Sequence, residues 1–210
     1  AELKASHHFI DKAGLILVNS NNVTIEGIII HGNKDNRTGS QAASNCVYTS
    51  NNYGYNMRVA QGENFRFYKS VSRDALCGTG MEVTGYNGNI TIENSVFANN
   101  GFHNRNMLWA DGITVHGAYD STFKNNLLYN NTDVDMIFGG CLNCRIQNNK
   151  IQHDESFTGS SFAALMLHAW PSSNNNTVAG NYIGTEVSHN EINCGSSNKQ
   201  RCGFGMLLGS

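Results

Sequence analysis

Charged residues are scarce in this chain, at 14% of 210 residues, against about a quarter in an average globular protein. Hydrophobic residues reach 40%. This composition excludes a chain kept disordered by charge, which needs a high net charge and little apolar content. The formal net charge of -2 offers no broad basic surface, so we expect no nucleic-acid partner. No apolar run approaches the roughly 20 residues of a membrane-spanning helix, so we expect no membrane span.

Helical periodicity is missing as well, because no stretch repeats its apolar residues convincingly at the 3.6-residue spacing of a helix. The 31 asparagines outnumber even the 22 glycines. Asparagine is a poor helix former and a good turn residue, since it tolerates left-handed backbone angles. The composition therefore predicts short strands joined by turns, without helices.

Six cysteines are an even number, which allows fifteen disulfide pairings. Cys141 and Cys144 lie close in the sequence, as do Cys194 and Cys202. The two that remain are Cys46 and Cys77. Six buried free thiols are one alternative, and a zinc site at CLNC (141–144) is another, although no second metal-binding motif accompanies it.

Five Asn-X-Thr sequons also occur, at Asn22, Asn36, Asn89, Asn130 and Asn175. Asparagine is so frequent that chance alone produces several of them. Together with the cysteines, they favour a secreted or cell-surface glycoprotein with disulfides.

Short apolar strands recur in one register along the chain. The first series is GLILV (14–18), NMRVA (56–60), GMEVT (80–84), GITVH (112–116), DMIFG (135–139), ALMLH (164–168) and GMLLG (205–209). The second series, whose members each follow one of the first, is VTIEG (23–27), FRFYK (65–69), ITIEN (90–94), TFKNN (122–126), RIQNN (145–149) and TVAGN (177–181). A unit of about 23 residues with aligned strands predicts a parallel β-solenoid, whose rungs stack about 4.8 Å apart around one core.

A third, fainter series is GIIIH (27–31), SVFAN (95–99), NLLYN (126–130) and NKIQH (149–153). The position after the second strand is Asn94, Asn125 or Asn148 in three rungs, and Gly27 or Gly180 in others. Stacked asparagine amides can bond to one another along a column, so we predict a structural asparagine ladder at this bend. Leucine-rich repeats lack support because their leucine spacing is absent, and a β-sandwich would not repeat one aligned unit.

We therefore predict an all-β chain, a parallel β-helix of about six to seven rungs that forms a single domain over residues 1–210. The last strand, FGMLLGS (204–210), has no second strand after it, and the first rung has no cap. An uncovered solenoid end invites association. We expect the chain to be a segment of a longer polypeptide, incomplete at one or both ends, and self-association through the ends is the alternative.

The aligned strands place side chains in columns. Ile113 and Val115 should face inward, and the residues between them outward. Glu82 then lies in one outward column. His116 and His168 share the next, two rungs or about 10 Å apart.

Three acids, Asp111, Asp133 and Asp135, stand at the same edge of this sheet, and Asp135, which aligns with Gly112, should also point outward. The only two tryptophans, Trp109 and Trp170, flank these rungs. Aromatic rings beside hydrogen-bonding acids are a common way to hold sugars. Paired carboxylates can cleave a glycosidic bond, since crowding raises the pKa of one of them and makes it an acid at neutral pH.

These columns predict a site on the outer face. The candidate catalytic residues are Asp111, Asp133, Asp135, His116 and His168, and the candidate substrate-binding residues are Trp109, Trp170 and Glu82. Aspartates at strand starts also satisfy turn amides, the histidines can be plain surface residues, and Glu82 can form a surface ion pair with Arg58. An open groove with converging carboxylates would favour an enzyme, whereas acids bonded to backbone amides would favour a structural role.

At WADGITVH (109–116) followed by NNTDVD (130–135), the sequence resembles the right-handed parallel β-helix superfamily of pectate lyases and polygalacturonases. Within it, the site region resembles the α-1,3-glucanase and mycodextranase glycosidases, which have a similar ADGI strand start and then an Asn-Thr-Gly-Asp-Asp turn with catalytic acids. The resemblance implies catalysis by Asp111 and by Asp133 or Asp135. Here Val134 separates the last two acids, so at most one of them stands where the family's pair does.

The sequence thus favours an extracellular glycoside hydrolase that acts on a polysaccharide without a cofactor. One alternative is a non-catalytic surface-fibre or adhesin module that binds glycans or only builds length. The many stacked asparagines suit such a module. Another is a lyase or epimerase in which the acid cluster holds Ca²⁺.

Overall fold

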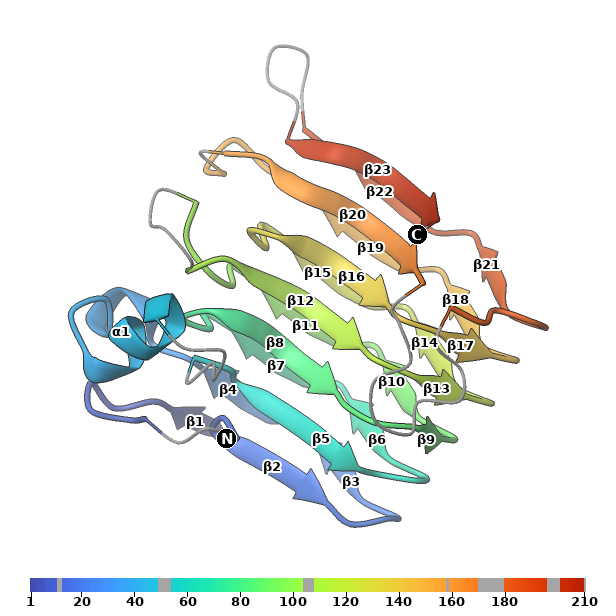
Figure 1. Ribbon diagram of the computed structural model, residues 1–210, viewed down its shortest axis with the longest axis horizontal. Helices are drawn as coiled ribbons and strands as arrows, with labels where there is room; N and C mark the ends of the chain where they lie inside the picture. The colour runs from blue at the N-terminus through green and yellow to red at the C-terminus, as the bar shows by residue number, and fades with distance from the viewer. Residues whose placement is uncertain are drawn as a thin grey trace.

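The computed structural model describes residues 1–10, 13–48, 54–103, 108–157, 159–169, 180–195 and 201–209. In these ranges the chain winds through a stack of rungs, and each rung adds one strand to each of three long sheets (Figure 1). The strand pairs within these sheets are parallel. The predicted all-β solenoid is confirmed, and its longest sheets hold seven strands.

Sheet 1 contains the predicted first series: β2 (Ile16–Asn19), β5 (Met57–Gln61), β8 (Gly78–Val83), β12 (Ala110–Val115), β16 (Val134–Phe138), β20 (Ser161–His168) and β23 (Cys202–Gly209). Sheet 2 contains the second: β3 (Thr24–Glu26), β6 (Arg66–Tyr68), β10 (Thr91–Glu93), β14 (Thr122–Lys124), β18 (Arg145–Gln147) and β21 (Glu186–Ser188). The sixth member was predicted wrongly: it is β21, whereas Gly180 and Asn181 lie in no strand and residues 177–179 are outside the described residues.

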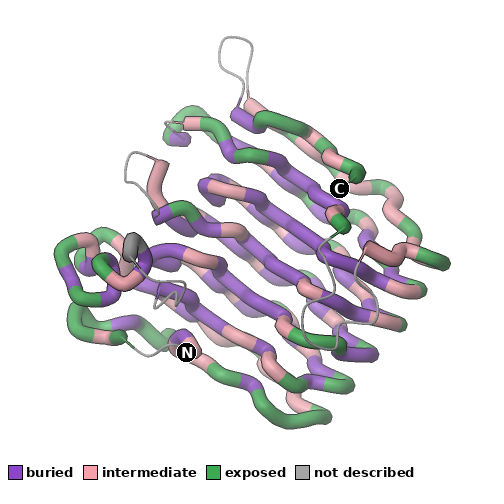
Figure 2. The backbone as a smooth tube through the Cα atoms, viewed as in Figure 1, coloured by how far each residue is buried: buried purple, intermediate pink, exposed green. Residues whose placement is uncertain are grey.

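Sheet 3 contains the faint third series: β1 (Glu2–Lys4), β4 (Ile29–His31), β7 (Val71–Arg73), β11 (Val96–Ala98), β15 (Leu127–Tyr129), β19 (Lys150–Gln152) and β22 (Glu191–Asn193). A small sheet 4 joins β9 (Asn87–Gly88), β13 (Ala118–Tyr119) and β17 (Cys141–Leu142). Large apolar side chains fill the space between the sheets, with Phe67, Phe97, Phe123 and Phe138 fully buried. Figure 2 shows this burial running along the strands of successive rungs.

The prediction of no helix was wrong. A single helix of eight residues, α1 (Gln41–Tyr48), interrupts the solenoid between β4 and β5, after the short 3-10 turn η1 (Lys34–Asn36). Ser40 precedes it, and its hydroxyl accepts a hydrogen bond from the Ala43 N–H at 3.4 Å, as an N-cap does. The disulfide between Cys46 and Cys77 ties the helix to the start of β8. No helix in the described ranges is long and apolar enough to cross a membrane.

The other two disulfides join Cys141 to Cys144 and Cys194 to Cys202. All six cysteines are therefore paired with one another, so the alternatives of free thiols and of a zinc site were wrong.

Left-handed backbone angles explain the wealth of asparagine. Each rung turns its corners at residues with positive φ, which asparagine tolerates better than most side chains do. At the corner between sheets 2 and 3 they are Gly27, Lys69, Asn94, Asn125, Asn148 and His189. At the corner leading into sheet 2 they are Asn22, Asn64, Asn89, Asp120, Asn143 and Gly184.

The asparagine ladder exists one residue later than predicted. Asn126 Nδ2 donates to Asn149 Oδ1 at 3.0 Å, and Asn149 Nδ2 donates to Asn190 Oδ1 at 2.9 Å. The predicted residues Asn94, Asn125 and Asn148 are the exposed corner residues just before this column. Because the corner turns the chain, the residue after it points inward, and the buried amides can then bond along the stack.

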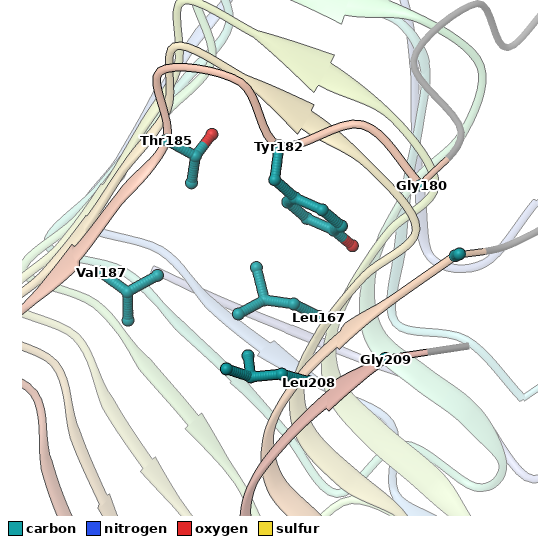
Figure 3. A pocket seen from close by; sticks show the side chains of 8 residues that line it. Leu167, Gly180, Tyr182, Thr185, Val187, Leu208 and Gly209 are labelled. Atoms are coloured by element: carbon teal, nitrogen blue, oxygen red, sulfur yellow. The ribbon is translucent and has the colours of Figure 1, made fainter.

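At β23 the interior opens into a cavity of about 370 Å³ (Figure 3). Its walls are mostly apolar, with Leu167, Val187 and Leu208 projecting into it beside Tyr182 and Thr185. None of the predicted site residues lines it. This end of the core therefore stands apart from the outer face on which the site was predicted.

Candidate functional site

Asp111 lies on β12 and points to the outer face of sheet 1. Its Oδ2 accepts a hydrogen bond from the Thr114 hydroxyl at 2.6 Å, and its Oδ1 accepts one from the Val134 N–H at 2.9 Å. Burial and the neighbouring charge of Asp133 raise the pKa of Asp111 to about 8, although both hydrogen bonds act in the opposite direction. The Asp111 carboxyl therefore carries a proton at neutral pH.

Asp133 precedes β16 on the next rung, where its backbone N–H donates to the Ala110 carbonyl at 3.2 Å. Burial raises the pKa of this carboxyl too. Burial thus disfavours ionisation of both acids, and the charge of Asp133 further opposes ionisation of Asp111. Asp111 and Asp133 are thus brought together, as the sequence predicted.

Apolar side chains surround this acid pair on the outer face. Val134, Ile137, Ala163 and Met166 form a compact cluster there, none of them more than 7% exposed. Val134 follows Asp133 directly, and its backbone N–H donates to Asp111 Oδ1 at 2.9 Å. An apolar surrounding of this kind disfavours a charged carboxylate, which is the physical source of the raised pKa values.

Asp135 does not point outward, and that expectation was wrong. The residue is fully buried, with its Oδ2 2.8 Å from His153 Nε2 and its Oδ1 accepting a hydrogen bond from Asn131 Nδ2 at 2.8 Å. Strict alternation breaks here, because Asp135 and Met136 both face the interior while Val134 faces out. Asp135 is therefore a structural acid paired with a buried histidine, and we remove it from the catalytic set.

The outer histidines share a column as predicted. His116 follows β12 and His168 ends β20, with Gly139 between them in the register. His116 Nε2 lies 3.0 Å from Glu82 Oε1, whose other oxygen is 3.3 Å from Arg58 Nε. Glu82 is thus held between two basic side chains, and the ion pair with Arg58, considered as an alternative, is present.

Exposed aromatic rings border the acid pair. Trp109 directly precedes β12 and is 48% exposed, whereas Trp170 lies outside the described residues. Phe162 and Phe204, which the sequence pattern did not predict, are 49% and 45% exposed and pack edge to face with 5.7 Å between ring centres. The Phe162 N–H donates to the Asp133 carbonyl at 2.6 Å, which places this residue beside the acid pair. The signal that could have revealed Phe162 is a large apolar residue at a strand start where other rungs have polar or small residues.

The sequons differ in accessibility. Asn22, Asn36 and Asn89 are exposed, and Asn175 lies outside the described residues. Asn130 is 5% exposed, and its amide donates to Asp154 Oδ1 at 3.0 Å. A glycan on Asn130 would have to break this bond and open the surrounding packing, so the folded chain disfavours this sequon.

Among the described residues, no group of three or more histidine, cysteine, aspartate or glutamate side chains is arranged to hold a metal ion. Comparison with known proteins adds a family and no individual relative. No curated protein and no solved structure matches the chain. A family model described as "Right handed beta helix region" matches residues 37–200, which is most of the chain and includes both acids. Since the parallel sheets agree with that description, the chain belongs to the right-handed β-helix family.

Proposed function

We propose that the chain is a secreted glycoside hydrolase that cleaves a polysaccharide on the outer face of sheet 1. The observation that carries the proposal is the acid pair on neighbouring rungs, with Asp111 protonated at neutral pH beside Asp133. Three disulfides are compatible with an oxidising, extracellular compartment.

In this mechanism Asp111 acts as the general acid and donates its proton to the glycosidic oxygen as the bond to the leaving sugar breaks. Asp133, in its ionised form, either activates water or attacks the sugar. The exposed rings of Trp109 and Phe162 offer apolar faces for the sugars on either side. The buried apolar cluster beside the acids keeps the reacting groups away from bulk water.

A non-catalytic glycan-binding module is the second candidate. It is favoured by the two hydrogen bonds that Asp111 accepts, from the Thr114 hydroxyl and the Val134 N–H, because a bonded acid also serves to join adjacent rungs. In that case the outer face would bind a polysaccharide through its aromatic rings and leave it intact.

The test is incubation of the chain with a panel of neutral and acidic polysaccharides, measuring new reducing ends. We expect one substrate to be cleaved, and Asp111→Asn and Asp133→Asn each to lower the rate about 10²- to 10⁴-fold. Asp120→Asn, at an exposed corner, is the matched control and should retain full activity. Binding without new ends would support the second candidate, and normal cleavage by both variants would contradict the site. Unsaturated products that absorb in the ultraviolet, and that no longer form when Ca²⁺ is chelated, would instead identify a Ca²⁺-dependent lyase.

A further inference from the structure

Lys34 is a half-buried lysine without a carboxylate partner. It opens η1, and its Nζ donates to the carbonyl oxygens of Asn99 and, at 2.7 Å, Gly101. Within the described ranges no carboxylate forms an ion pair with it, since the nearby Asp74 is paired with Arg73 at 3.1 Å. Burial lowers the pKa of Lys34, and the nearby charges of Asp74 and Asp35 oppose this effect only in part.

Lys34 borders a cavity of about 140 Å³ between the ends of the sheet 3 strands and the starts of the sheet 1 strands. His103 lines the same cavity, and its Nε2 is buried with no hydrogen-bond partner among the described residues. Thr132 lines it too, and its oxygen accepts a bond from the Ala110 N–H at 3.0 Å, which leaves the hydroxyl hydrogen to donate. One charged and two neutral groups able to donate therefore meet around one small space.

None of the described residues that line this cavity is an acid. Three acids, Asp35, Asp133 and Glu155, directly adjoin lining residues in the sequence but do not line the cavity themselves. Asp154 accepts hydrogen bonds from two further lining residues, Asn130 and Ser156. His103 Nε2 has no partner among the described residues, and Lys34 Nζ has a third hydrogen beyond the two that it donates to carbonyl oxygens. A bound anion would accept charge-assisted hydrogen bonds from these groups. The volume admits a small charged group rather than a whole sugar ring.

We propose that the Lys34 cavity binds a carboxylate group. One lining residue connects the cavity to the acid pair: Thr132 directly precedes Asp133, and its hydroxyl oxygen accepts a bond from Ala110, which directly precedes Asp111. The carboxylate can belong to a free small acid, or to an acidic sugar held at the outer face. The second source rests on the proposed hydrolase function, whereas the first does not.

The experiment follows the histidine ring resonances of the full chain by NMR during titration with sodium acetate, sodium glucuronate, inorganic phosphate or glucose at constant ionic strength. We expect a saturable shift of the His103 ring with acetate and glucuronate, and none at His8, which is exposed. Tighter binding of glucuronate than of acetate would identify an acidic sugar as the source, and equal or weaker binding would identify a free acid. No saturable shift with either, or a shift with phosphate alone, would overturn the proposal.

Lys34→Met should weaken the binding at least tenfold, whereas Lys4→Met, which removes an exposed lysine, should leave it unchanged. If Lys34→Met does not fold, the titration of the unaltered chain still decides. The titration measures binding of a carboxylate and needs no cleavage of polysaccharide. A failure of this proposal can therefore be distinguished from a failure of the proposed hydrolase function.

Discussion

Asp111 and Asp135 stand on neighbouring strands of sheet 1, yet they occupy opposite faces. Asp135 is fully buried inside the solenoid and lies 2.8 Å from the ring of His153, an ion-pair geometry. Asp111 on the outer face has only neutral hydrogen-bond donors and a second acid beside it. The inner carboxyl is therefore held by hydrogen-bonding partners inside the core, whereas the outer one keeps a proton at neutral pH.

The largest effect should come from breaking the inner pair. His153→Ala leaves a buried carboxylate without its partner, and we expect it to lower the free energy of unfolding by about 3–5 kcal/mol. Asp135→Ala should act in the same direction. Asp111→Ala, measured at pH 8, should cost far less because the outer acid has no charged partner to lose.

Urea denaturation of the three variants measures this contrast, with Glu155→Ala as the exposed control. Losses below about 1 kcal/mol for both inner variants would show that the buried pair does not stabilise the fold. A larger loss for Asp111→Ala than for His153→Ala would reverse the comparison.

The face on which Asp135 lies could not be predicted from strand alternation alone. Periodicity located the strands and brought Asp111 and Asp133 to one edge, but it assumed that every second residue points outward. Two consecutive residues face inward at this place in both β16 and β20, where Ala164 and Leu165 are both in the core. Gly112 shares this column with Asp135 and lies in a crowded place, since a Cβ there would come within 2.4 Å of the Asp135 carbonyl.

The outer acid predicts a specific dependence of stability on pH. Its pKa is about 8 in the folded chain and about 3.9 when unfolded, so between these values only the folded chain keeps the proton. Unfolding then releases a proton, and stability falls as the pH rises from about 4 to 8, by at most about 1.4 kcal/mol per pH unit.

Asp111→Asn should remove this decline in stability. The free energy of unfolding of the variant should therefore increase relative to that of the unaltered chain as the pH rises. Urea midpoints at pH 5, 6.5 and 8 measure the difference, and the titration of other groups cancels in the comparison. A difference that stays constant across these values would show that the pKa of Asp111 is not raised.

The corners of the rungs likewise show which parts of the fold the sequence repeat could predict. The repeat in the sequence located the three sheets, because each rung repeats its apolar residues in one register. It misplaced the ladder by one residue, because two rungs have neighbouring asparagines with different roles at this corner. In one of them Asn125 adopts the left-handed turn and Asn126 makes the buried bond. Helix α1 escaped detection because it is a single short insertion whose disulfide and cap, rather than its periodicity, hold it in place.

Substituting Asn125 and Asn126 one at a time should separate their roles. Asn126→Ala removes the acceptor of the Ser95 N–H and leaves the Ile92 carbonyl without the amide that donates to it at 2.9 Å. We expect a loss of about 1–3 kcal/mol, because buried polar groups lose their partners. Asn125→Gly keeps a residue that adopts positive φ at no steric cost, so its effect should stay within about 0.5 kcal/mol. Thermal and urea unfolding of the two variants compare them directly, and equal losses would show that the turn, rather than the buried bond, is what asparagine contributes at this corner.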